Sequence, residues 1–143
     1  MNSKVYVCSP LRAKTNEEVR NNIEMAKNYC KKIGVMTRMR AIAPHTILPD
    51  YFDDNIPEER ELCVNFGLKL LEQCEMLFVC GDHISRGMAK EISYARKLDI
   101  PIFYYTENGS LSTITAEDGT YIQQIFPEKK PVGQRNRNLI FTL

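Results

Sequence analysis

Four short apolar runs recur along the chain, separated by longer segments with helical periodicity. They are Lys4–Cys8, Met39–Ala43, Met76–Cys80 and Ile100–Tyr105. Most of them are rich in β-branched or aromatic residues, and each is too short for a helix of ordinary length. Continuous apolar strands are typical of a sheet that is covered on both faces. The pattern therefore predicts a parallel sheet with helices on its two sides.

Three helices are predicted between these runs. The first begins after a cap at Thr15 or Asn16, and Gly34 is expected to end it. The second covers Pro57–Gln73, with proline at the favourable first position, and the third covers Gly87–Leu98. The predicted fold class is α/β: a three-layer sandwich with a mostly parallel sheet of four to five strands, flavodoxin-like or Rossmann-like. Its crossovers are expected to be right-handed.

The chain is predicted to be a single domain over residues 1–143, because it has no internal repeat, low-complexity run or linker. Its core is expected over residues 4–112, followed by a C-terminal extension over 113–143. In that extension, Tyr121–Phe126 is predicted to be a short helix and Asn138–Leu143 a last strand.

Composition excludes several classes of protein. A formal net charge of +1 gives no global field toward nucleic acid or a membrane surface, so neither partner is expected. No signal peptide and no bilayer-spanning apolar stretch is visible. The five cysteines form no C-x-x-C pair, which favours reduced thiols in the cytoplasm. With two histidines, no metal site is expected, and no cofactor is predicted.

Polar segments follow three of the predicted strands: Cys8–Arg12, Gly81–Glu91 and Thr106–Ser112. The carboxyl ends of parallel strands meet at one edge of a sheet, and ligands bind there. We therefore expect a small phosphorylated ligand, such as a nucleotide, at this edge.

The segment Gly81–Glu91 has the richest chemistry. Ser85 is placed to cap the next helix, and Gly87 allows close approach of a ligand, so the helix start suits a phosphate. Glu91 lies further along the helix and points either into the same crevice or to solvent. The simpler alternative, a capping serine and an exposed glutamate, stays open. Two more candidate binding residues here are Asp82 and Met88, the methionine being alternatively a core residue.

Other candidates come from the first strand and from the long loop predicted over Pro44–Ile56. Ser9 supplies a hydroxyl, and Arg12 suits bidentate recognition of phosphate or carboxylate, unless it is a solvated turn residue. Tyr6 is either a site hydroxyl or a core aromatic. His45 is a candidate contact to a base or sugar, with a structural histidine as the alternative.

These motifs together resemble the nucleoside 2-deoxyribosyltransferase superfamily, and most closely its small, often phage-encoded relatives. The resemblance spans about residues 4–112. The matching positions are Pro44, His45, Glu59, Arg60, Cys74, Glu75, Gly81–Ile92, Ala95 and Ile100–Ile102.

The resemblance implies a function. It makes Glu91 a nucleophile that attacks the anomeric carbon, with Tyr6 beside it, in a retaining mechanism. Ser85 resembles the phosphate-binding serine of the branch that hydrolyses deoxynucleoside 5′-monophosphates; transferases acting on free nucleosides have aspartate there. A further phosphate-binding serine, matched here by Ser112, is supplied by a neighbouring subunit. A homodimer or higher homo-oligomer with shared sites is therefore expected.

One position departs from the family pattern. The superfamily has an aspartate where this chain has Gly67, and that carboxyl group orients the sugar and protonates the departing base. General acid catalysis contributes about 10²–10⁴-fold. Substitutes considered from the sequence are Asp53, Asp54, Glu61 and Asn65.

Three hypotheses follow. The first is a hydrolase or transferase that cleaves the N-glycosidic bond of a (deoxy)nucleoside 5′-monophosphate. The second is a binding protein that sequesters a nucleotide or nucleotide-derived signal, for which phosphate contacts and a stacking aromatic such as Tyr51 or Phe52 suffice. The third is an interaction module without a ligand, in which Arg12, Ser85 and Glu91 lie apart.

Overall fold

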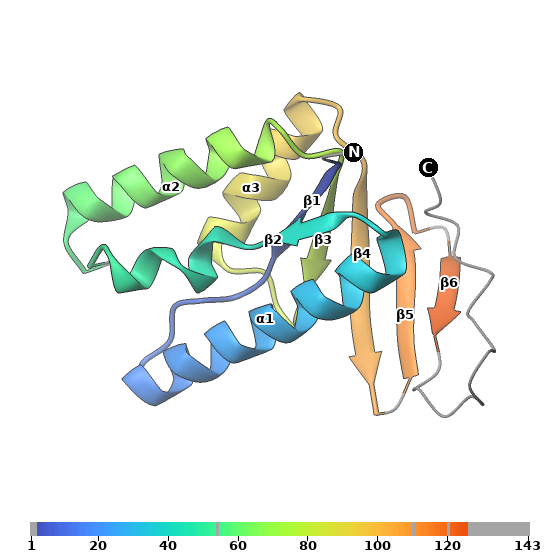
Figure 1. Ribbon diagram of the computed structural model, residues 1–143, viewed down its shortest axis with the longest axis horizontal. Coiled ribbons are helices and arrows are strands. Elements are labelled where there is room, and N and C mark those ends of the chain that lie inside the picture. Colours follow the sequence, from blue (N-terminus) through green and yellow to red (C-terminus); the bar gives the residue numbers. More distant parts are fainter. Residues whose placement is uncertain (1–2, 54, 110, 120, 126–143) are drawn as a thin grey trace.

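The computed structural model describes residues 3–53, 55–109, 111–119 and 121–125. Its elements (Figure 1) are β1 (Lys4–Cys8), α1 (Asn16–Thr37), β2 (Arg40–Ile42), η1 (Pro44–Thr46), η2 (Leu48–Asp50), α2 (Pro57–Leu71), β3 (Met76–Cys80), α3 (Arg86–Lys97), β4 (Ile102–Asn108), β5 (Leu111–Ala116) and β6 (Tyr121–Ile125). Within the described ranges, none of the helices combines the length and apolar character that crossing a membrane requires.

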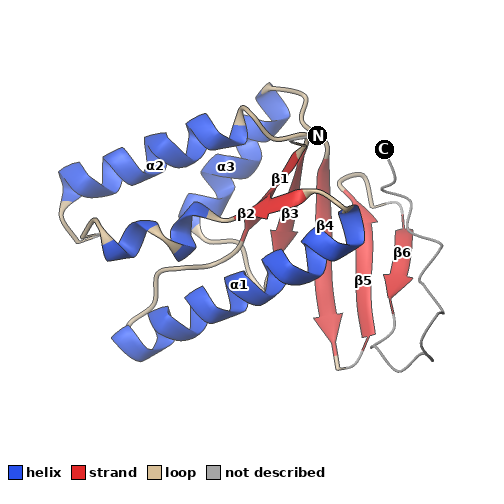
Figure 2. Cartoon of the chain, viewed as in Figure 1, coloured by secondary structure: helices blue, strands red, loops and turns tan. Residues whose placement is uncertain are grey.

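The strands form one sheet in the order β2-β1-β3-β4-β5-β6 (Figure 2). The first four strands in this order are parallel, and β5 and β6 continue the sheet as antiparallel neighbours. The predicted α/β class and mostly parallel sheet are confirmed. The sheet has six strands where four to five are predicted, because the segment predicted to be a short helix forms β6. From β1 the chain crosses outward to β2 and then returns to β3 on the other side of β1. This reversal is a topological switch point, which leaves a crevice at the carboxyl ends of β1 and β3.

The helices cover both faces of the sheet. Successive side chains of β1 point to opposite faces. Val5 and Val7 belong to one buried cluster with Ile33 of α1, whereas Tyr6 belongs to a second cluster with Ile92 of α3. Thus α1 covers one face, and α2 and α3 cover the other, as the three-layer prediction requires.

Helix α1 begins where the sequence predicts and ends later. Thr15 is its N-cap: the threonine hydroxyl oxygen accepts a hydrogen bond from the Glu18 amide, and the Glu18 carboxylate accepts one from the Thr15 amide. The helix continues past Gly34 and ends at Thr37, and its C-cap residue Arg38 has a φ of 60°. The prediction that Gly34 ends the helix was wrong, because the buried Met36 extends the apolar face by a further turn.

The helix predicted over Tyr121–Phe126 was also wrong. Residues Tyr121–Ile125 form β6, which pairs with β5 across a turn that contains Gly119 at a φ of 92°. A helix of this length is unstable by itself, whereas pairing with β5 satisfies the backbone groups of the segment. The strand expected over Asn138–Leu143 lies outside the described residues.

The connection between β2 and α2, expected to be a loop, is ordered by short local turns. The Ile47 amide donates to the carbonyl of Pro44 at 3.0 Å, and the Phe52 amide donates to the carbonyl of Leu48 at 2.9 Å. Helix α2 then starts at Pro57, as predicted.

Candidate active site

A cavity of about 450 Å³ lies at the carboxyl end of β1, on the face of the sheet that α2 and α3 cover. Its position agrees with the switch point. Its walls come from the end of β1, the β2–α2 connection, α2 and the start of α3. The described residues that line it are Tyr6, Ser9, Leu11, Arg12, Pro44, His45, Leu48, Pro49, Phe52, Arg60, Cys63, Val64, Gly67, Ser85, Arg86, Gly87, Met88 and Glu91.

A tyrosine and a glutamate meet at the buried end of the cavity. The hydroxyl of Tyr6, a residue only 1% exposed, donates a hydrogen bond to Oε2 of Glu91. Burial raises the pKa of Glu91, and hydrogen bonds from Tyr6 and Cys8 partly offset this rise. Burial and the neighbouring Glu91 raise the pKa of Tyr6, so the phenol keeps its proton at neutral pH. The pair combines a carboxylate with a fixed hydrogen-bond donor.

Gly67 of α2 faces the same pair. A Cβ atom at this position would lie 2.9 Å from the hydroxyl oxygen of Tyr6 and 3.7 Å from Oε2 of Glu91. The position at which the sequence departs from the superfamily pattern is therefore part of the site. Any side chain at position 67 would need the Tyr6 hydroxyl to move.

The acidic or polar residues predicted to replace the missing carboxyl group do not line the cavity where the structure describes them. Among the described residues, Asp53, Glu61 and Asn65 are exposed and do not line it. Asp54 lies outside the described residues. Glu91 is thus the one carboxylate among the described residues that line the cavity.

One stripe of α2 forms a wall of the cavity. Arg60, Cys63, Val64 and Gly67 follow the spacing i, i+3, i+4, i+7, which places them on one helix face. Arg60 lies about 10 Å along the helix axis from Gly67 at 1.5 Å per residue. This wall thus carries a guanidinium group toward one end and bare backbone at the other. Arg60 was not predicted as a site residue, although its helical spacing from Gly67 could have identified it.

The start of α3 forms another part of the cavity wall. Ser85 is the N-cap, and its Oγ accepts a hydrogen bond from the Met88 amide at 3.2 Å. The amides of Arg86 and Gly87 have no intrahelical acceptor, as at any helix start. A Cβ atom at Gly87 would meet no atom within 4 Å, so the backbone is open to a ligand there. Ser85 therefore both caps the helix and lines the cavity.

Ser9 and His45 form a second polar pair in the cavity. Oγ of Ser9 lies 2.9 Å from Nε2 of His45, and Ser9 is 6% exposed. Burial lowers the pKa of His45 to about 4, so the imidazole is neutral at pH 7. Met88 is 2% exposed and packs in the same core cluster as Tyr6, which makes it both a lining and a core residue.

The charges that line the cavity are mainly positive. The described lining includes Arg12, Arg60 and Arg86 against the single carboxylate of Glu91. Arg12 was predicted; Arg86, which directly follows the capping Ser85, was missed. This balance favours an anionic ligand. In the described part of the chain, no group of three or more histidine, cysteine, aspartate or glutamate side chains could hold a metal ion.

The sequence predicts a stacking aromatic at Tyr51 or Phe52. Phe52 lines the cavity, whereas Tyr51 is 75% exposed and does not. Of these two aromatic residues, Phe52 is therefore the one that lines the cavity.

Asp82 lies outside this cavity. It is exposed and its carboxylate is 2.7 Å from Nδ1 of His83, whose hydrogen bond lowers the Asp82 pKa. Both residues line a second hollow, beside α1 and the ends of β3 and β4.

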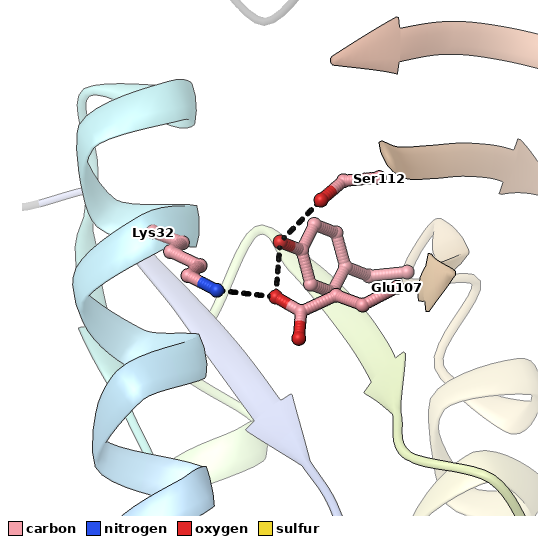
Figure 3. A network of polar contacts seen from close by, with 4 residues as sticks. Lys32, Glu107 and Ser112 are labelled. Atoms are coloured by element: carbon pink, nitrogen blue, oxygen red, sulfur yellow. Dashed lines mark hydrogen bonds and ion pairs between the residues drawn. The ribbon is translucent and has the colours of Figure 1, made fainter. Parts of the chain in front are cut away.

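Ser112 also lies away from the cavity of its own chain. It belongs to β5, and its hydroxyl oxygen is 3.1 Å from the hydroxyl oxygen of Tyr105. Tyr105 donates to Glu107 at 2.8 Å, and Glu107 pairs with Lys32 at 2.5 Å (Figure 3). This network ties β4 and β5 to α1. A role for Ser112 in the site of a neighbouring subunit stays a prediction.

The sequence matches a family model described as Domain of unknown function (DUF7768) over residues 3–105. The chain belongs to this family. The matched range contains every described residue that lines the cavity and leaves out β5, β6 and Ser112. The DUF7768 region is therefore the parallel part of the sheet together with its candidate active site.

Among solved structures, the chain is similar to a 2-deoxyribosyltransferase from the psychrotolerant bacterium Bacillus psychrosaccharolyticus. The TM-score is 0.54 at 16% sequence identity, and the match covers 75% of this chain and 74% of that chain. This likeness establishes a shared fold between a DUF7768 protein and that enzyme. The comparison with curated proteins found no match.

Proposed function

We propose that this protein is an N-glycosidase or deoxyribosyltransferase-like enzyme that cleaves the N-glycosidic bond of a (deoxy)nucleoside 5′-monophosphate. One observation carries the proposal: the Tyr6–Glu91 hydrogen bond lies at the buried end of a cavity whose other charged lining residues are arginines. A carboxylate at one end and cations elsewhere suit a ligand with an electrophilic carbon at one end and a phosphate at the other. The fold shared with a 2-deoxyribosyltransferase supports a nucleoside or nucleotide ligand.

Glu91 is the proposed nucleophile. Its ionised carboxylate oxygen forms a bond to the anomeric carbon while the C–N bond breaks, and the electron pair of that bond goes to the base nitrogen. Water or an acceptor base then displaces the carboxylate, which restores Glu91. The hydrogen bond from Tyr6 holds the attacking group in place and favours its ionised form against the effect of burial.

The start of α3 is the proposed phosphate site. Backbone amides at a helix N-terminus bind anions, and the open space beside Gly87 allows close approach. Arg12 and Arg86 line the same cavity and add charge-assisted hydrogen bonds. Phe52 and the neutral His45 are left to contact the base or sugar.

A second candidate function is a binding protein that sequesters a nucleotide or a nucleotide-derived molecule without turnover. Gly67 favours this alternative, because bare backbone faces the Tyr6–Glu91 pair where a carboxyl group would help the base to leave. Such a protein needs the phosphate contacts and the Phe52 surface but no reactive glutamate.

We also propose a homo-oligomer in which Ser112 completes the phosphate site of a neighbouring subunit. Sedimentation of the purified chain measures its oligomeric state, and nucleotide affinity compared between wild type and Ser112→Ala tests the role of the serine. A monomer at all concentrations, or unchanged nucleotide affinity in Ser112→Ala, would contradict it.

The experiment that tests the proposed function is base release from a panel of ribo- and deoxyribonucleoside 5′-monophosphates, with wild type and Glu91→Gln in parallel. Melting shifts recorded on the same samples report binding. Base release that disappears in Glu91→Gln supports the enzyme. A melting shift without base release, unchanged in the variant, supports the sequestering protein. If neither base release nor a melting shift is observed, both proposed functions are contradicted.

A further inference from the structure

Among the described residues at the inner end of the cavity, no carboxylic acid besides the proposed nucleophile is placed to protonate a leaving group. Glu91 is the one carboxylate among the described lining residues, and it is already the proposed nucleophile. At Gly67 the cavity wall consists of backbone alone. A Cβ atom built at this position would lie 3.7 Å from Oε2 of Glu91. Paired carboxyl groups in glycoside cleavage act as a nucleophile and as a general acid. The described lining supplies a carboxylate for the first role and no second carboxyl group for the other.

The other titratable groups in the lining are poor proton donors at neutral pH. The low pKa of His45, about 4, leaves its imidazole without the extra proton. The phenol of Tyr6 donates its hydrogen to Glu91, and its pKa is raised by burial. The thiol of Cys63 lines the cavity but is a far weaker acid than a carboxyl group.

We infer that the preferred substrates are nucleotides whose base ring already carries a positive charge, so that the base leaves without being protonated. This inference rests on the proposed function. N-ribosylpyridinium nucleotides and N7-alkylated purine nucleotides belong to this class. The inference follows from the position of Gly67 beside the Tyr6–Glu91 pair and from the carboxylate content of the described lining.

The bond changes balance without an added acid. As Glu91 bonds to the anomeric carbon, the C–N electron pair moves onto the ring and neutralises its positive charge. The base departs neutral, and water later hydrolyses the glycosyl-enzyme, its proton passing to solvent. With an ordinary purine, the same electron pair would leave an anion on the base, which raises the barrier unless a proton is supplied.

The cavity also suits such a substrate electrostatically. The positive ring would lie near the carboxylate of Glu91, while the phosphate would lie near the arginines and the start of α3. Each charged end of the ligand then meets lining of the opposite sign.

A matched pair of substrates tests the inference: guanosine 5′-monophosphate and its 7-methyl derivative, each with ribose and with 2′-deoxyribose. Nicotinamide mononucleotide serves as the pyridinium probe. We expect Glu91-dependent base release from the cationic probes to exceed that from guanosine 5′-monophosphate by roughly 10²-fold or more. Release from the two guanine nucleotides within about tenfold of each other would overturn the inference while leaving the proposed function intact. No Glu91-dependent release from any probe would overturn both.

Two variants give an independent readout. Gly67→Asp introduces a carboxyl group beside the pair, and Gly67→Asn introduces the same shape without an acid. We expect Gly67→Asp to raise base release from guanosine 5′-monophosphate relative to Gly67→Asn. The rate of base release from the 7-methyl nucleotide should then exceed that from guanosine 5′-monophosphate by a smaller factor. The inference would be contradicted if the ratio of base release between the 7-methyl and the unmethylated nucleotide were equal in the two variants. Thermal melting should first show that both variants are folded. Should both variants unfold because Tyr6 cannot move, the substrate comparison on the wild-type protein decides.

Discussion

The phenol of Tyr6 and the carboxylate of Glu91 are joined by a hydrogen bond across 85 residues of sequence. Strand β1 carries the donor and helix α3 carries the acceptor, and both side chains lie against the glycine of α2. Three elements of the fold therefore converge on the hydrogen bond between Tyr6 and Glu91.

Tyr6→Phe is expected to lower base release roughly 10- to 100-fold at neutral pH, because a hydrogen bond to a charged group contributes about 1.5–3 kcal/mol. The pKa of Glu91 should rise in the variant, since the hydrogen bond that opposes burial is lost. The acidic limb of the pH–rate profile should therefore move to higher pH. Tyr94→Phe is the matched control, because Tyr94 donates to Glu72 outside the cavity. Equal effects of the two changes would contradict the assignment.

Glu91→Gln is expected to raise the melting temperature at pH 7 by a few degrees. Because the folded-state pKa of Glu91 lies above its ordinary 4.5, the native state holds its proton more tightly than the unfolded chain does. The wild-type protein therefore loses stability as the pH rises from about 4.5 through the folded pKa. Glutamine removes this loss and still accepts the Tyr6 hydrogen bond. Melting curves of both proteins should converge at pH 4; a constant difference across pH would count against a buried carboxylate with a raised pKa.

His45→Asn is expected to flatten the acid side of the stability curve. The pKa of His45 is about 4 in the folded protein against an ordinary 6.5, so the unfolded chain binds the proton more readily. Stability contributed by the neutral imidazole is present above pH 6.5 and is lost as the pH falls toward 4, amounting to about 3 kcal/mol. Urea unfolding at pH 7 and pH 4.5 measures the slope. In the control His83→Gln the exposed histidine is removed, and the wild-type slope should persist.

Arg60→Gln is expected to weaken nucleoside monophosphate binding about tenfold, because the cavity loses one of the positive charges that attract the anionic ligand. Calorimetric titration at low and moderate salt should show a smaller salt dependence than in the wild-type protein. The control is Arg20→Gln, an exposed arginine of α1 that lines neither cavity. Equal losses from the two variants would show that only general charge matters.

The parallel sheet and the carboxyl-edge position of the site could be predicted from the sequence because both follow from local patterns. Short apolar runs between amphipathic segments leave few alternatives to a covered parallel sheet, and the strand ends must then meet at one edge. The helix start at Pro57 and the serine cap at Ser85 were visible for the same reason, since each depends on a few neighbouring residues.

Long-range packing decided the rest. No local signal showed that β6 would pair with β5, that Gly34 would lie within α1, or that Asp82 would lie outside the cavity. The same holds for Arg60, which becomes a site residue only because α2 turns one stripe toward β1.

The sequence by itself determined the fold class, the chemistry available at the strand ends and the absence of an aspartate at position 67. Only the tertiary structure decided that Gly67 faces the Tyr6–Glu91 pair and that Phe52, not Tyr51, reaches the cavity. The physical reason is that backbone preferences and periodicity act over a few residues, whereas the distance between side chains on separate elements depends on how the helices pack on the sheet.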